Sequence, residues 1–420
     1  MTTLRLAKEL TALEKLRALL DAVASLGDRA GVVYLVGGTV RDILLGEESF
    51  DVDIAVEGDA IEFARALTSA LEGRMTSHQK FGTAAVLYGA DERVDVVTTR
   101  TELYDAPGAL PTVRRAGLRE DLFRRDFTIN AMAVSLQPTD FGRLVDPYGG
   151  RADLDARLLR VLHNLSFIDD PTRIFRGIRY EARYGLRLEE HSARLAHACI
   201  EMGLVGGLSS ARLRDELQRL LEDPGAIGGI LRLGELAADR AIHPHLRADS
   251  EAAALFERAN ALRDELHADV PSWRIGCAVL GRKMSPEDAH TWLEGLNMRR
   301  RDVDRIAGAI TVAPRIVERL RSERLRPAEV VALADPFAPD APLLALAMED
   351  RPELRDYFTR LRDVRIEIGG TELVALGLAE SPRVGEVLAE LRRRRLNGEL
   401  DGRDSELAAA RDLIAETPDA

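Results

Sequence analysis

The chain has 420 residues, of which 46% are hydrophobic and 30% charged; this composition is ordinary for a soluble globular protein, and the length is too great for one compact core. The net charge of −12 argues against a protein that binds nucleic acid over its whole surface. It is compatible with a local basic surface that binds nucleic acid. No apolar run approaches the roughly 20 residues that span a bilayer, so we expect no membrane segment.

The N-terminal segment has the pattern of an amphipathic helix over residues 3–26, with leucines along one stripe. It lacks the apolar core and the cleavage site of a signal peptide, which predicts a cytoplasmic location. The two cysteines, Cys199 and Cys277, lie in apolar helical patterns without metal-ligand spacing. They are predicted to be buried thiols, and we expect no zinc site.

A glycine turn follows the first predicted strand, residues 31–36. Gly37 and Gly38 end this strand, and a short predicted helix over 39–45 carries Arg41 in its first turn. Backbone N–H groups of such a turn and helix start can bind the phosphates of a nucleotide, and Arg41 would add a charge-assisted contact. Gly-Gly pairs also occur at plain turns, so the turn alone does not decide between the two interpretations.

Two aspartates lie two residues apart in the next predicted strand, residues 50–56. Asp51 and Asp53 alternate with apolar residues, so both carboxylates point to the same face of the sheet. They repel each other unless a divalent cation neutralises them, which favours Mg²⁺ bound by both. Most Asp-x-Asp pairs are solvated strand residues. This pair indicates a metal site because a glycine turn lies just upstream of it. Asp95, on another alternating strand, is either a general base or a solvated carboxylate.

The remaining elements of the first 150 residues predict an α+β fold, with a small mixed sheet and helices on one side of it. We expect a helix over 59–71 capped by Asp59, and short strands over 74–78, 82–88 and 93–98. Residues 101–118 contain two prolines and two glycines without a clear period, and are predicted to be a long loop.

After about residue 151 strand patterns nearly vanish, and amphipathic helices follow one another to the end of the chain. Prolines over 336–342 predict a domain boundary. One helix begins at Asp170-Pro171, a strong helix start. Five arginines of this helix fall within roughly 120° of arc, which suits phosphates or base edges, although an ordinary amphipathic face is the competing interpretation. They are Arg173, Arg176, Arg179, Arg183 and Arg187.

Three strings of the sequence occur in the order and spacing of the motifs of one enzyme family. They are residues 35–57 around the glycine turn, residues 124–133 (RRDFTINAMA) and residues 169–180 (DDPTRIFRGIRY). Together they resemble the bacterial-type (class II) CCA-adding enzymes and their relatives, the CC-adding and A-adding enzymes and the poly(A) polymerases. The resemblance is dense over 31–225 and thin over 226–360.

The resemblance implies a nucleotidyltransferase head of the polymerase-beta-like kind, followed by all-α parts. The implied parts are a catalytic head over 1–150, a neck over 151–225 with the nucleotide-selecting motif, an RNA-binding body over 226–340 and an RNA-binding tail over 341–420.

The resemblance also implies roles for single residues. Asp51 and Asp53 would hold two Mg²⁺ ions, ATP and CTP would be the substrates, and Arg125 would reach the nucleotide. Asp170 would accept from the amine of cytosine or adenine, and Arg173 would donate to the neighbouring ring nitrogen or carbonyl, so that uracil and guanine are rejected. The expected catalytic residues are Asp51, Asp53 and Asp95, and the expected nucleotide-binding residues are Gly37, Gly38, Arg41, Arg125, Asp170, Arg173, Arg176 and Arg179.

The implied function is template-independent transfer of CMP or AMP to the 3′ end of tRNA, with release of pyrophosphate. The acceptor stem and T-arm of the tRNA would lie along arginine-rich segments at 114–125, 173–187, 299–326 and 392–395. For 299–326 a solvated amphipathic face is an equally good interpretation. A poly(A) polymerase acting on general RNA and a catalytically silent RNA-binding protein are the alternatives. A monomer and a dimer both remain open.

Two departures from the family pattern narrow the expectation. Residues 276–283 lack the His-Asp pair of the metal phosphohydrolase segment that many relatives carry, so we expect no phosphatase activity. CC-adding members have a shortened loop between the first and second motifs, whereas the segment 101–118 is long. We therefore expect an enzyme that can add the terminal A, and both A-adding and CCA-adding members remain open.

Overall fold

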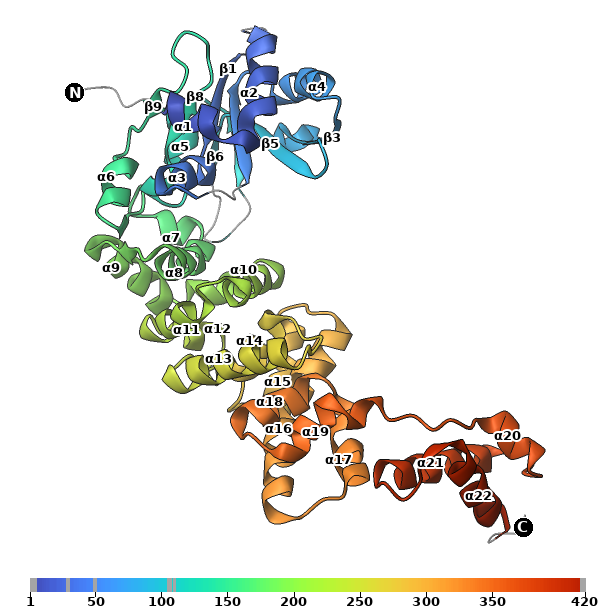
Figure 1. Ribbon diagram of the computed structural model, residues 1–420. Helices are drawn as coiled ribbons and strands as arrows, with labels where there is room; N and C mark the ends of the chain where they lie inside the picture. The colour runs from blue at the N-terminus through green and yellow to red at the C-terminus, as the bar shows by residue number, and fades with distance from the viewer. Residues whose placement is uncertain (1–5, 28–30, 48–50, 104–107, 109–110, 416–420) are drawn as a thin grey trace. The chain divides into compact units, whose positions relative to one another are not determined.

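The computed structural model describes residues 6–415 except 28–30, 48–50, 104–107 and 109–110. The chain forms two compact units. The first holds the residues up to Glu216 together with Asp223–Gly229 and Leu236–Ala241, and the second holds Leu217–Glu222, Ile230–Glu235 and the chain from Ile242 onward. The sheet strands belong to the first unit, and the second unit is helical in its described residues (Figure 1).

The core of the first unit is a seven-stranded mixed sheet with the order β3-β4-β5-β2-β1-β8-β9. Only β2 and β5 are parallel neighbours; the other neighbours are antiparallel. The strands are β1 (Val32–Val36), β2 (Val52–Glu57), β3 (Arg74–His78), β4 (Thr83–Tyr88), β5 (Glu92–Thr98), β8 (Ala133–Ser135) and β9 (Leu144–Val145). The predicted α+β fold with a small mixed sheet is confirmed.

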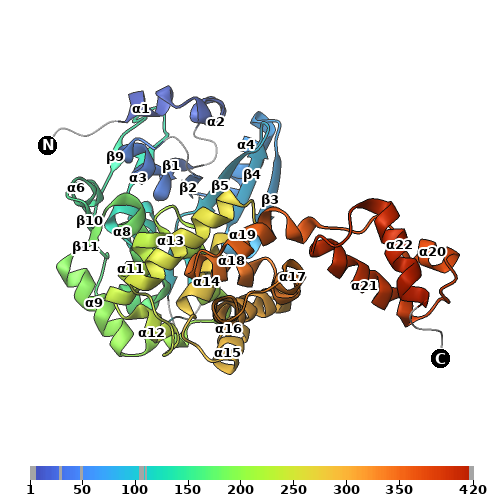
Figure 2. The same cartoon turned by 60° about the horizontal axis from the view of Figure 1, so that its bottom comes forward.

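Helices cover both faces of this sheet. On one face α4 (Ala60–Ala70) packs against β2 to β5 and against α2 (Glu14–Leu26) (Figures 1 and 2). On the other face Leu118 and Leu122 of α5 (Leu118–Phe123) pack with Ala55 of β2. The prediction that helices lie on one side was therefore wrong, because α5 packs on the face opposite α4 and the order of elements along the chain does not specify which face a helix covers.

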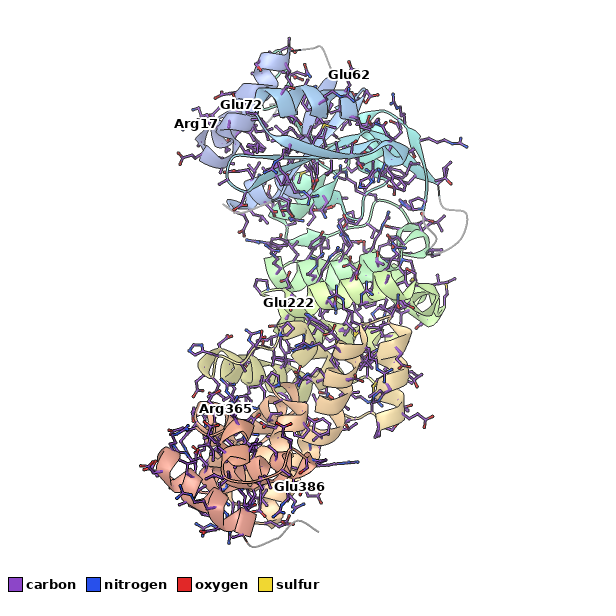
Figure 3. All side chains as sticks on the ribbon, turned by 90° about the vertical axis from the view of Figure 1, so that its right-hand side faces the viewer. Arg17, Glu62, Glu72, Glu222, Arg365 and Glu386 are labelled. Atoms are coloured by element: carbon purple, nitrogen blue, oxygen red, sulfur yellow. The ribbon has the colours of Figure 1, made fainter. Side chains whose placement is uncertain are left out.

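The amphipathic patterns of α2 and α4 place their charged residues outward. Arg17 and Glu62 are exposed (Figure 3), whereas Leu16 and Phe63 are buried. Asp59 caps α4 as predicted, accepting hydrogen bonds from the backbone N–H groups of the first turn.

Two predictions of secondary structure needed correction. The N-terminal helix is broken at Leu13 into α1 (Ala7–Ala12) and α2; residues 3–5 of the prediction lie outside the described residues. The predicted loop 101–118 contains an antiparallel ribbon of β6 (Arg100–Leu103) and β7 (Thr112–Arg115). This ribbon is separate from the seven-stranded sheet, so its strands are short and mostly solvated and lack the apolar alternation that identifies a core strand.

Most of the remaining chain is helical, as predicted. The helices of the first unit continue with α3 (Gly38–Leu45), α6 (Gly150–Asp155), α7 (Ser166–Asp169), α8 (Thr172–Tyr184) and α9 (Glu190–Glu201), while α10 (Ser210–Glu222), α11 (Ala226–Glu235) and α12 (Ala238–Ile242) contribute to both units. Two-residue strands β10 (Leu158–Leu159) and β11 (Arg187–Leu188) pair in parallel.

The second unit contains a core of long helices and a separate C-terminal cluster. Its helices are α13 (Ser250–Glu265), α14 (Ser272–Leu280), α15 (Pro286–Gly295), α16 (Arg300–Ser322), α17 (Pro327–Ala334), α18 (Asp340–Met348), α19 (Pro352–Thr359), α20 (Gly370–Ala375), α21 (Pro382–Leu396) and α22 (Gly402–Ala415). Residues of α18 at the expected boundary 336–342 are buried against α16. The division into head, neck, body and tail stays a prediction.

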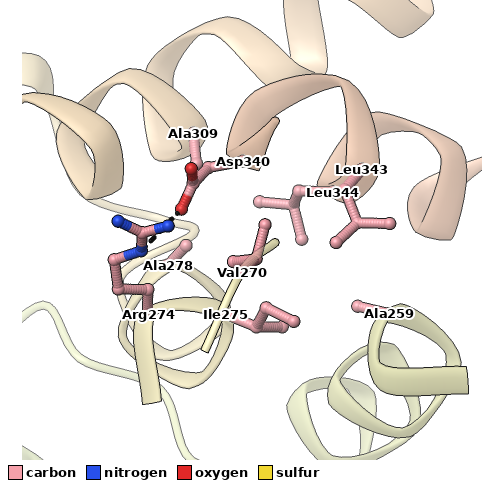
Figure 4. Close-up of a pocket in the computed structure, with 9 residues that line it drawn as sticks. All are labelled: Ala259, Val270, Arg274, Ile275, Ala278, Ala309, Asp340, Leu343 and Leu344. Carbon is pink, nitrogen blue, oxygen red and sulfur yellow. Dashed lines mark ion pairs between the residues drawn. The ribbon is translucent and has the colours of Figure 1, made fainter. Parts of the chain in front are cut away.

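A pocket in the second unit is lined by apolar side chains and one buried ion pair (Figure 4). The Nε of Arg274 lies 3.0 Å from Oδ1 of Asp340, and burial raises the pKa of Asp340. None of the expected site residues lines this pocket, so it belongs to the packing of α14, α16 and α18.

Cys199 and Cys277 are both buried, as predicted.

The arginine cluster at the end of α21 is engaged with acidic side chains of the same unit. Arg392 pairs with Asp335, and both Arg393 and Arg394 pair with Glu390. These partners neutralise part of the cluster, which weakens the expectation that residues 392–395 form an RNA track.

Within the described ranges no single helix is long and apolar enough to cross a membrane. One pair of segments, Pro327–Phe337 and Asp340–Met348, meets the criterion of length and composition when taken together, with a bend of 116° between them.

Candidate active site

The glycine turn after β1 requires a glycine for two reasons. Gly37 has φ of +70°, a backbone conformation that other residues rarely adopt. A Cβ at this position would also lie 2.4 Å from Nη1 of Arg125. The guanidinium of Arg125 therefore packs directly on the turn, and α3 begins at Gly38 with its first N–H groups beside it. Two of the three predicted motifs meet at this point.

Arg125 is held in place by a buried acid that sequence reasoning missed. Asp121 of α5 accepts from Nη2 of Arg125 at 3.0 Å and from Arg124 at 2.8 Å. Burial opposes ionisation of Asp121, but the two guanidinium groups outweigh it and lower the pKa of this carboxyl. Nη1 of Arg125, the atom nearest to Gly37, donates to the backbone carbonyl of Asn130 at 3.5 Å. Each terminal nitrogen carries two hydrogens and donates in one of these bonds, so the fixed side chain keeps an N–H at the turn.

The predicted carboxylates lie on the sheet face that α5 covers. Asp51 is exposed and directly precedes β2, and Asp53 lies in β2 in register with Asp95 of the parallel strand β5. Asp53 has the same orientation as Ala55, which packs against α5. Residue 50, the first of the predicted strand, lies outside the described residues. The structure therefore brings the three aspartates to neighbouring positions at one end of β2 and β5.

Burial and two neighbouring carboxylates shift the pKa of Asp53 upward. Burial raises its pKa to about 6; Arg125 opposes the shift, and the charges of Asp95 and Asp51 add to it. Asp95 is partly exposed and accepts from the exposed Arg93 at 2.8 Å. A cation bound between Asp51 and Asp53 would relieve the repulsion that disfavours the ionised form.

The donor set suits Mg²⁺ that arrives with a nucleotide. The described residues contain no group of three or more His, Cys, Asp or Glu side chains arranged to hold a metal ion by themselves. Mg²⁺ usually takes one or two carboxylates and completes its shell with water and substrate phosphates. Asp51 and Asp53, close to a glycine turn that can bind phosphates, match that requirement.

Arg41 lies beside Gly38 of the glycine turn but is engaged by partners within the protein. The residue is only 5% exposed, and its guanidinium donates to Oδ1 of Asn130 at 2.7 Å and to the hydroxyl of Tyr184 at 2.8 Å. It also forms an ion pair with Asp42 and lies 4.5 Å from the centre of the Tyr184 ring. These contacts connect α3 with α8, and the binding of a triphosphate by Arg41 stays a prediction.

The arginine face of α8 is also directed inward over most of its length. Arg173 is 4% exposed and donates to Oγ of Ser166 and to the backbone carbonyl of Arg124. Arg176 pairs with Asp126, and Arg179 lies 3.9 Å from Glu216. Arg173 is thus engaged by a hydroxyl and a backbone carbonyl, and Arg176 and Arg179 lie next to acids; the binding of a nucleotide by these three residues stays a prediction. Arg183 and Arg187 are exposed.

Asp170 uses one carboxylate oxygen for structure. Oδ1 accepts from the N–H of Thr172 at 3.0 Å and from its hydroxyl at 2.6 Å, and it lies 2.7 Å from Nη2 of Arg212. These contacts hold the start of α8, one residue later than predicted, and none of them uses Oδ2. The two interpretations of Asp170, helix capping and base recognition, are compatible because a carboxylate has two oxygens.

Arg212 is a second residue that sequence reasoning missed. It lies on α10, donates to the carbonyl of Gly108 at 3.0 Å and pairs with Asp170. It thereby connects the carboxylate proposed to recognise the base with the segment between β6 and β7. Its partners are distant in sequence, so no local spacing indicates them.

Comparison with known proteins identifies the family. Residues 33–160 match the family described as "Poly A polymerase head domain". The chain is 36% identical over 408 residues to an A-adding tRNA nucleotidyltransferase of Geobacter sulfurreducens, covering 94% of this chain but 46% of that protein. It is 31% identical to an A-adding tRNA nucleotidyltransferase of Halalkalibacterium halodurans, covering 94% of this chain and 92% of that protein.

A solved structure agrees over the whole length of both chains. The Thermotoga maritima CCA-adding enzyme complexed with tRNA is 31% identical, with a TM-score of 0.81, and the match covers 99% of this chain and 100% of that chain. The head match alone would leave a poly(A) polymerase open, but the relatives that match throughout are tRNA nucleotidyltransferases and CCA-adding enzymes. Since the similarity extends through the helical second unit, the chain belongs to the bacterial-type tRNA nucleotidyltransferase family.

Proposed function

We propose that this enzyme adds the terminal AMP from ATP to tRNA that ends in CC, and releases pyrophosphate. Membership of the family makes the chain an enzyme of tRNA 3′-end nucleotide addition. The choice of AMP rests on the two relatives above, which are both A-adding enzymes, and on the long segment between the first and second motifs. The poly(A) polymerase alternative is not favoured.

The proximity of Asp51, Asp53 and Arg125 is the observation that supports nucleotidyl transfer at this site. Asp51 and Asp53 would hold Mg²⁺, whose chemistry in such a site is activation of the RNA 3′ hydroxyl and neutralisation of charge on the α-phosphate and the leaving pyrophosphate. Arg125, fixed by Asp121, would donate to the triphosphate at the Gly37 turn. Gly38 would present the N–H groups at the start of α3 to the same phosphates.

Asp170 and Arg173 would select the base. The unused Oδ2 of Asp170 would accept from the exocyclic amine of adenine or cytosine. Each terminal nitrogen of Arg173 carries two hydrogens and donates in one described bond, so an N–H remains for the ring nitrogen next to that amine. Guanine and uracil would place a carbonyl against the carboxylate.

The function is tested with purified enzyme, Mg²⁺ and three tRNA substrates that end at the discriminator base, at C and at CC. Each is offered labelled ATP or CTP, and the products are resolved by length. We expect a single A on the CC-ending tRNA and no addition of C. Addition of C to the shorter substrates together with A on the CC-ending tRNA would identify a CCA-adding enzyme, and addition of C alone a CC-adding enzyme. Long A tails on unrelated RNA would identify a poly(A) polymerase, and failure with every substrate would refute the proposal.

Changing the carboxylate of Asp170 is expected to relax base selection. Asp170→Asn replaces an acceptor by an amide that can also donate, so the preference for ATP over GTP in kcat/KM should fall by about 10- to 100-fold. The ratio is measured with CC-ending tRNA in parallel reactions. Glu190→Gln, at an exposed acid of α9 paired with Arg194, is the matched control and should leave the ratio unchanged. Unaltered selectivity in Asp170→Asn would defeat base recognition by this residue.

A further inference from the structure

We infer that the hydroxyl of Thr39 is a positioning group that fixes the separation of the two metal-binding carboxylates, an inference that rests on the proposed roles of Asp51 and Asp53. Thr39 lies in the first turn of α3 and is 1% exposed. Its Oγ1 donates to the backbone carbonyl of Asp51 at 2.8 Å and accepts from the backbone N–H of Asp53 at 3.0 Å. One hydroxyl thus holds the backbone of both residues that carry the carboxylates.

The chain topology explains why a side chain is needed at this point. β1 and β2 pair antiparallel up to Leu35 and Ile54, and continuing that register would place Gly37 opposite Val52. The chain instead turns at Gly37, whose N–H donates to the carbonyl of Met132. In a continued ladder the carbonyl of Asp51 would accept from the N–H of Gly38 and the N–H of Asp53 would donate to the carbonyl of Val36; both groups bond to Thr39 instead.

The Thr39 hydroxyl replaces these two backbone partners. A hydroxyl can donate and accept at once, so it satisfies both backbone groups on the side facing α3. Because Thr39 follows the Gly37-Gly38 turn directly, the same contact connects the proposed phosphate site with the proposed metal ligands. Without the hydroxyl, the backbone at both ends of Val52 would be free to shift, and the carboxylates with it.

The test compares two substitutions that separate shape from hydrogen bonding. Thr39→Val keeps the branched shape and removes the hydroxyl, whereas Thr39→Ser keeps the hydroxyl and loses a methyl group. Binding of Mn²⁺ to the enzyme with ATP and without RNA is followed by water proton relaxation, so that no turnover is needed. Loss of a group that orients metal ligands typically weakens metal binding by 10- to 100-fold; we expect about a tenfold weaker Mn²⁺ affinity in Thr39→Val and a change within about twofold in Thr39→Ser.

A matched control is Thr68→Val in α4, where the hydroxyl donates to the carbonyl of Ala64 at 2.6 Å, well separated in sequence from the carboxylates. It should leave Mn²⁺ affinity unchanged. Thr39→Val with a lowered melting temperature but normal Mn²⁺ affinity would overturn the positioning role and leave the proposed function standing. Absence of Mn²⁺ binding in the unmodified enzyme with ATP would overturn both.

Discussion

Asp53→Asn is expected to lower kcat/KM for the addition of AMP from ATP by about 1000-fold or more. The substitution keeps the shape of the side chain but removes the charge that would hold Mg²⁺ next to Asp51. Loss of several kcal/mol of transition-state stabilisation corresponds to this factor, since each 1.36 kcal/mol is tenfold in rate. Single-turnover addition to a CC-ending tRNA, followed over hours, measures the residual rate.

The same substitution should not weaken the fold. The pKa of Asp53 is raised to about 6, above the ordinary value of 3.8, mainly by burial. A carboxyl that binds its proton more tightly in the folded chain opposes folding in its ionised form, so this penalty is present above about pH 6 and disappears as pH falls below the ordinary value. At pH 8 Asp53→Asn removes the penalty, and we expect an equal or higher melting temperature.

Asp91→Asn is the matched control for charge removal. Asp91 lies exposed in the turn between β4 and β5, and its loss should change neither activity nor melting temperature. A melting temperature that falls together with activity in Asp53→Asn would assign this carboxylate to structure. Retention of more than about a tenth of the activity would contradict the metal site.

The alternation of Asp51 and Asp53 with apolar residues was sufficient to predict the strand and its carboxylate face, since the period of a half-buried strand is a local property. The glycine turn and the start of α3 could also be predicted, because they depend on neighbouring residues only. The environment of each arginine could not be predicted in this way. Arg41 and Arg125 belong to similar charged strings and both lie against the glycine turn, but their partners differ: Arg41 donates to Asn130 and Tyr184, whereas Arg125 donates to Asp121. The two partners of Arg41 lie about 90 to 140 residues away in the sequence, where no local pattern indicates them.

The burial of the α8 arginines likewise depends on segments that lie far away in the sequence. The arc of five arginines was predicted to suit phosphates or base edges, with an ordinary amphipathic face as the competing interpretation. Here the partners come from distant strings: Asp126 pairs with Arg176, and Glu216 lies near Arg179. Asp121, by contrast, could have been found, because it lies three and four residues before Arg124 and Arg125, the spacing of helical ion pairs.

Asp126→Asn is expected to destabilise the first unit by about 3 kcal/mol. Asp126 is buried and accepts from the N–H of Phe127 at 2.8 Å, from Asn130 at 2.9 Å and from Nε of Arg176 at 2.8 Å. Removing its charge leaves the guanidinium without its counter-charge. Because 32% of the Arg176 side chain stays exposed and can hydrate, we expect the lower end of the range for broken buried pairs. The melting temperature of this unit should fall by roughly 6–12 °C.

The pH dependence of this loss separates the ion pair from simple packing. Burial opposes ionisation of Asp126, but Arg176 and the hydrogen bond from Asn130 outweigh it and lower its pKa from 3.8 to about 2. A carboxyl with a lowered pKa stabilises the folded chain fully above its ordinary value, and the contribution is lost as pH falls toward the lower one. The difference in unfolding free energy between the unmodified enzyme and Asp126→Asn should therefore be constant from about pH 8 to 5 and shrink between about pH 4 and 2. The matched control is Asp155→Asn, at an exposed acid paired with Arg151, which should lower the unfolding free energy by less than about 1 kcal/mol at every pH. If the loss of unfolding free energy in Asp126→Asn stays constant down to about pH 2, the charge of Asp126 contributes nothing to stability.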